Sequence, residues 1–187
     1  GRDLPFLLMP TSGTTGIPKL LLLTHEIFRQ RMNTYSYNLP TGAGMKALSL
    51  TNVAFGGARQ RALAQVLAGG CLTIMDRVNG MEALVEFILQ HEINFVAGVP
   101  SHMLVLLEYA RERRVLLPCV EAFQLSTTLV AEPLRAQICE HLTPSLCVRY
   151  GINEFGTVSR MIFIQSRRAP SLSPASIRIL PLSSNAP

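Results

Sequence analysis

Residues 11–19 read Thr-Ser-Gly-Thr-Thr-Gly-Ile-Pro-Lys and bring glycines, hydroxyls and a cation together in one short stretch. The glycines, Gly13 and Gly16, let backbone N–H groups approach an anion closely. Lys19 supplies a positive charge that offsets the charge of a phosphate chain. The hydroxyl groups that can donate to phosphate oxygens belong to Thr11, Ser12, Thr14 and Thr15. The pattern indicates a phosphate-binding loop; taken alone, it fits a solvated turn equally well.

The stretch differs from the loop of P-loop NTPases. A Walker loop places Lys directly after its second glycine and a Ser or Thr after that Lys. Here Ile17 and Pro18 separate Gly16 from Lys19, and Leu20 follows. The sequence therefore argues against a P-loop NTPase.

Two blocks of the sequence carry a specific resemblance to a known family. Residues 11–19 resemble the phosphate loop T-S-G-T-T-G-x-P-K of the adenylate-forming (AMP-binding) superfamily at every defined position. Thr24 and His25 are similar to the [ST]-H pair that opens the next helix in that superfamily. Residues 150–154, Tyr-Gly-Ile-Asn-Glu, resemble its Y-G-x-[TN]-E motif, in the same order and spacing. The superfamily contains acyl-CoA synthetases, luciferases and the adenylation domains of peptide synthetases.

The resemblance implies a role for each residue of these blocks. Tyr150 would lie against adenine, Asn153 would reach the α-phosphate and the acyl carboxylate, and Glu154 would hold Mg²⁺. An aromatic face stacks on a base, an amide donates to a phosphate, and a carboxylate binds a hard cation. The implied catalytic residues are Lys19, Asn153 and Glu154. The implied ATP-binding residues are Thr11, Ser12, Gly13, Thr14, Thr15, Gly16, Lys19, Tyr150 and Asn153.

Other positions resemble the acyl and adenine sites of the superfamily, or depart from them. Val99-Pro100 resembles the V-P that opens a helix beside the acyl pocket, and Phe55 either lines that pocket or is a core aromatic. Leu20 replaces the glycine that usually follows the loop lysine, so we expect its side chain to crowd the loop's exit. Residues 126–130 replace a small-residue turn that borders adenine, and they contain no glycine to admit the base closely.

The resemblance covers residues 3–164 and implies ATP-dependent activation of a small carboxylic acid. The acid attacks the α-phosphate, pyrophosphate leaves, and the acyl group passes to the thiol of coenzyme A or carrier phosphopantetheine. The chain shows no T-G-D segment and no lid domain with its lysine, so we expect activation to be incomplete. The alternative is a catalytically inactive, truncated or frameshifted remnant with at most nucleotide binding.

Short apolar runs alternate with longer amphipathic ones, which is typical of strand–helix–strand units with parallel strands. The expected strands cover residues 4–9, 20–23, 46–50, 71–75, 93–99, 122–125 and 146–149. The expected helices cover residues 24–35, 57–68, 81–91, 100–113 and 133–141. We therefore predict an α/β fold, a layered and parallel-rich sheet with flanking helices, as part of the adenylate-forming N-terminal domain.

Some details of these elements bear on the site. Thr24 is a plausible N-cap for its helix, with Glu26 in the first turn. Residues 20–23 are expected to form a buried strand, and the apolar face of residues 81–91 is expected to include Leu89. We expect the loop at 11–19 to join two strands in a hairpin-like connection and to face the same cleft as Glu154.

Charge and composition limit the class of partner. The chain carries a net charge of +5, but residues 1–159 hold 13 Lys and Arg against 12 Asp and Glu. The excess lies in Arg160, Arg167, Arg168 and Arg178, so we expect no nucleic-acid partner. No apolar run reaches the ~18 residues of a membrane helix, and no targeting segment is visible, so we expect a cytoplasmic protein. The four cysteines lack metal-ligand spacing and are expected to be buried, reduced thiols.

The texture of the sequence changes near the C-terminus. Residues 165–187 are rich in Ser, Pro and Arg and contain no glycine. Such a stretch lacks the apolar surface that offsets the entropy lost on ordering. We therefore expect a partial AMP-binding domain at 1–164 and a divergent, disordered tail at 165–187.

We predict that this chain alone forms acyl-adenylate far more slowly than a family member that has the lid lysine. A cation held against the reacting phosphate contributes roughly 10²–10³ in rate. The measurement is carboxylate-dependent exchange of labelled pyrophosphate into ATP with fatty, aryl and amino acids. Robust exchange with any of these acids would contradict the prediction.

Overall fold

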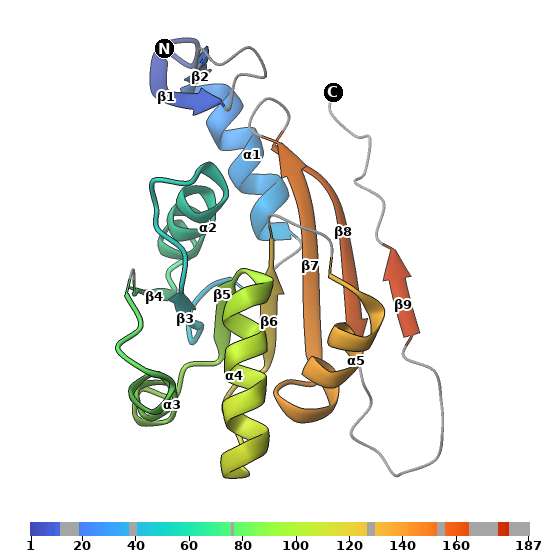
Figure 1. Cartoon of the computed structure of the whole chain (residues 1–187). Helices are drawn as coiled ribbons and strands as arrows, with labels where there is room; N and C mark the ends of the chain where they lie inside the picture. Colours follow the sequence, from blue (N-terminus) through green and yellow to red (C-terminus); the bar gives the residue numbers. More distant parts are fainter. Residues whose placement is uncertain are drawn as a thin grey trace.

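The computed structural model describes residues 1–11, 19–37, 41–75, 77–126, 130–152, 156–164 and 176–179. They form a two-stranded hairpin and a seven-stranded sheet with flanking helices (Figure 1). The strands are β1 (Pro5–Thr11), β2 (Lys19–Thr24), β3 (Lys46–Ser49), β4 (Cys71–Ile74), β5 (Phe95–Gly98), β6 (Ala122–Leu125), β7 (Ser145–Ile152), β8 (Gly156–Ile164) and β9 (Ser176–Ile179). The helices are α1 (His25–Tyr37), α2 (Gly56–Leu67), α3 (Met81–Gln90), α4 (Pro100–Arg113) and α5 (Glu132–His141).

The large sheet has the order β4-β3-β5-β6-β7-β8-β9. Strands β4, β3, β5, β6 and β7 run parallel, whereas β8 is antiparallel to β7 and β9 is antiparallel to β8. The predicted α/β fold with a parallel-rich sheet is therefore confirmed. None of the helices in the described residues is long and apolar enough to cross a membrane.

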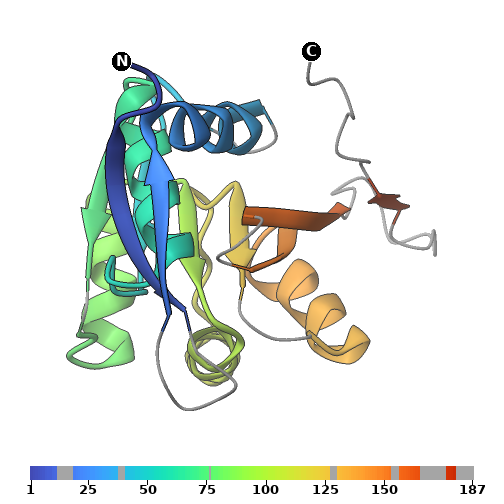
Figure 2. The ribbon, with the colours of Figure 1, turned by 90° about the horizontal axis from the view of Figure 1, so that it is seen from above.

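The chain crosses the sheet in two opposite directions, so its helices lie on opposite faces of the sheet. The chain moves from β3 to β4 through α2, and then moves the other way through α3, α4 and α5. Because crossovers between parallel strands are right-handed, α2 must cover the face opposite to α3, α4 and α5. Figure 2 shows α1 and α4 on opposite sides of the sheet.

Each face of the sheet buries its own apolar cluster. Alternate strand residues point to opposite faces, so Leu48, Val96 and Phe123 join one cluster while Ala47, Phe95 and Ala122 join the other. The first cluster packs against α3, α4 and α5, and the second against α1 and α2. The buried residues from α1 in the second cluster are Phe28, Met32 and Tyr35.

The hairpin brings the ends of the predicted phosphate loop together. Strands β1 and β2 are antiparallel, and Thr11 lies opposite Lys19. The hairpin-like connection predicted for residues 11–19 is therefore confirmed, while residues 12–18 lie outside the described part of the chain. Thr24 Oγ1 accepts a hydrogen bond from the N–H of Ile27 at 3.3 Å, as expected of the N-cap of α1.

Two predictions of burial are wrong. Leu20 and Leu22 are 67% and 47% exposed, because alternate residues of a two-stranded hairpin face away from α1. Leu20 thus points to the open surface of the hairpin. Leu89 lies at the margin of the apolar face of α3 and is 41% exposed.

None of the four cysteines forms a disulfide, and they differ in burial. Cys147 is buried as expected, whereas Cys71 is exposed at the start of the edge strand β4. Cys139 is partly buried, and desolvation raises the pKa of its thiol to about 11. The prediction of four buried thiols is therefore wrong for Cys71.

Strand β9 lies within residues 165–187, where we expected a disordered tail. Its residues pair with β8 from Met161↔Ile179 to Ile164↔Ser176. The remaining residues of this range lie outside the described part, so the domain boundary at residue 164 stays a prediction.

Gly151 is required by the close approach of β7 and β8. A Cβ atom built at Gly151 would lie 2.4 Å from the carbonyl oxygen of Gly156, well inside van der Waals contact. The neighbouring atom is backbone, so the two strands would have to separate.

We predict that Gly151→Ala lowers the free energy of unfolding by about 1–3 kcal/mol, the usual cost of overpacking. Urea unfolding followed by circular dichroism measures it. Gly1→Ala is the control, since a Cβ atom there meets nothing within 4 Å. Equal stability of the Gly151→Ala variant and the wild type would contradict the prediction.

Candidate functional site

A pocket of about 420 Å³ opens at the carboxyl ends of the parallel strands. Thr51 follows β3, Val99 follows β5, and Ser126 follows β6. Strands β3 and β5 are neighbours, but their following helices, α2 and α4, cover opposite faces of the sheet. Ligand sites of open α/β sheets lie at such switch points. The residues that line the pocket are Thr51, Phe55, Gly56, Gly57, Ala58, Gln60, Val99, Ser126, Arg149, Gly151 and Gly156.

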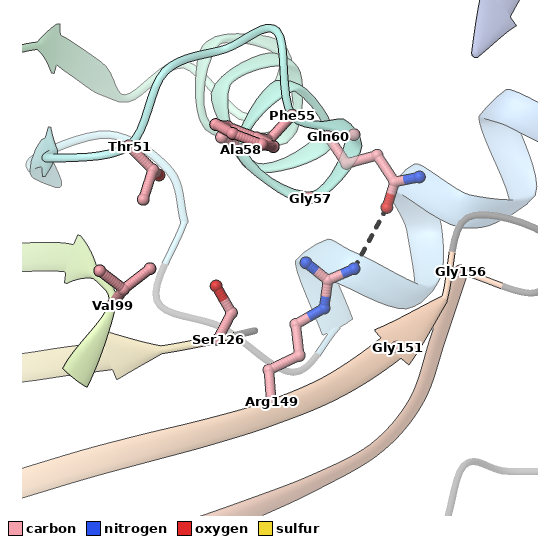
Figure 3. Close-up of a pocket in the computed structure, with 11 residues that line it drawn as sticks. Thr51, Phe55, Gly57, Ala58, Gln60, Val99, Ser126, Arg149, Gly151 and Gly156 are labelled. Atoms are coloured by element: carbon pink, nitrogen blue, oxygen red, sulfur yellow. Dashed lines mark hydrogen bonds between the residues drawn. The ribbon is translucent and has the colours of Figure 1, made fainter. Parts of the chain in front are cut away.

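Arg149 of β7 contributes the charge in the pocket (Figure 3). Its side chain is 7% exposed, and its guanidinium lies over the ring of Tyr35, with Cζ 4.8 Å from the ring centroid. Nε donates to Thr157 Oγ1 at 2.6 Å, and Nη2 donates to Gln60 Oε1 at 3.3 Å. These contacts hold the guanidinium between β7, β8 and the helices α1 and α2.

A second buried arginine, Arg61 of α2, lies behind the pocket and is 3% exposed. Its Nη2 donates to Ser49 Oγ at 3.0 Å and to Thr51 Oγ1 at 2.7 Å. Its Nη1 donates to Gln124 Oε1 at 3.3 Å, and that same oxygen accepts the hydroxyl of Tyr35 at 3.1 Å. These side chains form a buried polar cluster of Arg61, Arg149, Ser49 and Gln124. Strand alternation explains why they meet, because Ser49, Gln124 and Arg149 all point to the face of the sheet that α1 and α2 cover.

The cluster is positive and short of acceptors. Neither arginine forms an ion pair within the described ranges, where the salt bridges are Arg29–Glu26, Lys46–Glu92 and His141–Glu140. Arg61 Nε and Gln124 Nε2 are buried without a hydrogen-bond partner there. Burial lowers the pKa of the Arg61 guanidinium; Tyr35 acts against this shift, and the charge of Arg149 adds to it.

The structure describes part of the site that the sequence predicts. Thr11 and Lys19 face each other across the hairpin, and Tyr150 lies on β7 with 62% of its surface exposed. Two groups of predicted residues lie outside the described part: Ser12, Gly13, Thr14, Thr15 and Gly16 in the loop, and Asn153 and Glu154 after β7. Whether the loop and Glu154 face one cleft therefore stays a prediction.

Phe55 and Val99, which the sequence compares with the acyl pocket of the superfamily, line the same pocket. Phe55 is 67% exposed and lines the pocket, so the alternative of a core aromatic is wrong. Val99 lines the pocket as the N-cap of α4, with Pro100 in the first turn. Ser126 lines it as well, whereas residues 127–129 lie outside the described part.

The buried polar cluster was not predicted from the sequence. Arg61, Gln124 and Arg149 belong to three separate elements and to none of the recognised motifs. One signal was present: Arg149 and Gln124 lie within short apolar strands, where a polar residue needs a buried partner.

A comparison with known families matches residues 2–179 to the AMP-binding enzyme family. The chain belongs to the AMP-binding enzyme family. Similar curated relatives include enniatin synthetase of Fusarium oxysporum, 31% identical over 102 residues. Bassianolide nonribosomal cyclodepsipeptide synthetase of Beauveria bassiana is 29% identical over 101 residues. Each alignment covers 54% of this chain and 3% of the relative.

Solved structures of AMP-binding enzymes share the fold. A luciferase-like enzyme from the mealworm Zophobas morio matches 86% of this chain and 37% of its own, with a TM-score of 0.75 and 18% identity. O-succinylbenzoate coenzyme A synthetase of Bacillus subtilis, in complex with ATP and magnesium ion, matches 86% of this chain and 33% of its own. Its TM-score is 0.74 and its identity 20%. The fold is therefore that of the N-terminal domain of adenylate-forming enzymes.

The shortage of negative charge in the cluster leads to a stability prediction. We predict that Gln124→Leu lowers the free energy of unfolding by about 1–3 kcal/mol, because Tyr35 and Arg61 lose a buried acceptor. We predict that Gln124→Glu is at least as stable as the wild type at neutral pH. It keeps the acceptor, removes the unpartnered N–H group and adds a charge opposite to Arg61. Thermal and urea unfolding of the three proteins measure this order, and a Gln124→Glu variant less stable than Gln124→Leu would contradict it.

Proposed function

We propose that this chain binds ATP with Mg²⁺ and a carboxylic acid, the reactants of ATP-dependent acyl-adenylate formation. The observation that carries the proposal is the hairpin: Thr11 and Lys19 pair at its end, so the two ends of the phosphate-loop sequence are held together. Membership of the AMP-binding enzyme family supports the same reaction.

The residues available for nucleotide binding fit this proposal where the structure describes them. The side chain of Lys19 is exposed at the end of the hairpin, free of any ion pair to a described residue. The exposed ring of Tyr150 offers an aromatic face for a base. In our proposal the loop, Thr11 to Gly16, and Lys19 bind the phosphates, Asn153 contacts the α-phosphate, and Glu154 holds the metal ion. Mg²⁺ bound there would neutralise phosphate charge.

The acid would lie in the pocket at the strand ends. Its volume falls within the range of small-molecule sites, and Phe55, Ala58 and Val99 give it apolar walls. For the acyl acceptor we propose a thiol, either coenzyme A or carrier phosphopantetheine. One curated relative is named as a nonribosomal cyclodepsipeptide synthetase and one structural neighbour as a coenzyme A synthetase, so both acceptors are consistent with the family.

We predict that Lys19→Ala weakens binding of ATP·Mg²⁺ by roughly 10- to 150-fold in Kd. This is the scale of a charge-assisted hydrogen bond, about 1.5–3 kcal/mol. Isothermal titration calorimetry on the full chain measures it. The matched control is Lys46→Ala, which removes the same charge from an exposed pair with Glu92 at the amino end of β3.

Binding by the control should equal that of the wild type. An exposed ion pair contributes about 0–1 kcal/mol to stability, and Lys46 is the first residue of β3, whereas the pocket lies at the carboxyl ends of the strands. Equal affinities for the wild type and Lys19→Ala would remove the loop from the site. No binding of ATP·Mg²⁺ to the wild type would overturn the proposed function.

A further inference from the structure

The amino end of helix α2 faces the pocket without a cap. Phe55 is its N-cap residue and makes no side-chain cap hydrogen bond, and the first turn holds no acidic residue. The first helical hydrogen bond runs from Arg59 N–H to the carbonyl of Phe55. The N–H groups of the three residues between them, 56–58, therefore have no partner within the helix. All three residues line the pocket, so the positive end of the helix dipole is directed at it.

The Arg149 guanidinium lies beside this helix end. A Cβ atom built at Gly57 would lie 3.2 Å from Arg149 Nη1, so the absence of a side chain at Gly57 lets the two approach. Nε and Nη2 of Arg149 are engaged with Thr157 and Gln60, but Nη1 donates to no described residue. Figure 3 shows the guanidinium directed into the pocket below Gly57.

The amino end of α2 and the Arg149 guanidinium are both positive, so together they favour a bound negative charge. A buried guanidinium without an opposite charge is costly, and neutral acceptors such as Gln60 Oε1 and Thr157 Oγ1 cancel none of that charge. An anion placed between Nη1 and the N–H groups of residues 56–58 would accept from both sources. Arg61 behind the pocket wall adds a further positive charge that nothing in the described ranges neutralises.

The rest of the lining indicates what carries this anion. Phe55, Ala58 and Val99 are apolar, so they suit a hydrocarbon segment rather than a phosphate chain. Asn153, the proposed reaction centre, follows the last residue of β7 in the sequence. The three steps along β7 from Arg149 to Ile152 cover about 10 Å at the rise of an extended strand. A carboxylate reacting there and an anion at Arg149 would thus be opposite ends of one small molecule.

We propose that the acid bound by this pocket carries a second anionic group, held by Arg149 Nη1 and the amino end of α2, so that the substrate class is dicarboxylic acids. The inference rests on the proposed function, because it describes the acid that the chain would activate. Arg149 is then the residue that determines specificity for the far end of the substrate.

The test compares diacids with monoesters of the same length, which keep one carboxylate and lose the other charge. Glutarate and adipate are titrated into the full chain by calorimetry, without ATP, beside monomethyl glutarate and monomethyl adipate. We expect at least one diacid to bind about tenfold or more tightly than its monoester, the scale of a charge-assisted hydrogen bond. Arg149→Gln should abolish this preference. Arg111→Gln, at an exposed site in the last turn of α4, is the matched control and should keep the preference.

Gly57→Ala is a second variant that leaves every charge in place. Its Cβ atom would fill the space beside Nη1, so we expect a smaller diacid preference than in the wild type.

Equal binding of diacids and monoesters to the wild type, or no binding of any of them, would overturn the inference, and this comparison needs no variant. The proposed function is judged separately by ATP·Mg²⁺ binding and its loss in Lys19→Ala. A chain that binds ATP without diacid preference refutes the inference alone, and a chain with diacid preference but no ATP binding refutes the proposed function.

Discussion

Two guanidinium groups buried between one face of the sheet and helices α1 and α2 impose the main physical constraint on this structure. A buried arginine must place its N–H groups on acceptors, and those acceptors have fixed directions. Arg61 is held by Ser49, Thr51 and Gln124, and Arg149 by Gln60 and Thr157. These contacts connect α2 to β3, β6, β7 and β8, so the position of α2 on the sheet depends on them as much as on apolar packing. The apolar contribution of α2 to this face is small, with Ala64 as its buried member of the cluster.

The same constraint sets the electrostatic character of the pocket. Amide and hydroxyl oxygens satisfy the hydrogen-bonding groups of an arginine, but they leave its charge in place. Apolar walls such as Phe55 and Val99 lower the local dielectric, and a positive charge then acts more strongly on an anion than it would in water. The amino end of α2 also attracts an anion, since its N–H groups carry partial positive charge. The buried arginines therefore determine both the packing of α2 on the sheet and the preference of the pocket for an anion.

The sequence predicted the regular elements well because their signals are local. Pro100 and Pro133 lie in the first turns of α4 and α5, and the runs at 46–50, 71–75 and 122–125 became strands β3, β4 and β6. The sequence did not predict the exposure of Leu20 and Leu22, because burial of a strand depends on how many elements cover it. It also missed β8, which is antiparallel to β7, and β9, which is antiparallel to β8.

For the candidate site, the sequence named the motif residues and missed the charged cluster. The motif at 11–19 is contiguous, so it can be recognised in a linear string. Arg61 and Arg149 come together through sheet order and the handedness of the crossover, which no local pattern specifies. Gly57 could not be recognised from the sequence either. Its role depends on its closeness to Arg149 Nη1, and a lone glycine at the start of a helix does not indicate that neighbour.

Most side chains that line the pocket lie just past the ends of strands or at the start of a helix, outside the two apolar clusters. Phe55, Val99 and Ser126 belong to this group, and none of them is a buried member of the core. Such positions can accept mutations without loss of the fold, so new ligand preferences can arise by gene duplication and drift while the sheet stays intact. Arg149 differs, because it serves both the packing of α2 and the charge of the pocket. A lineage that exchanged it would have to rebuild Gln60 and Thr157 as well, so we expect the charge preference to be slower to evolve than the size or shape of the pocket.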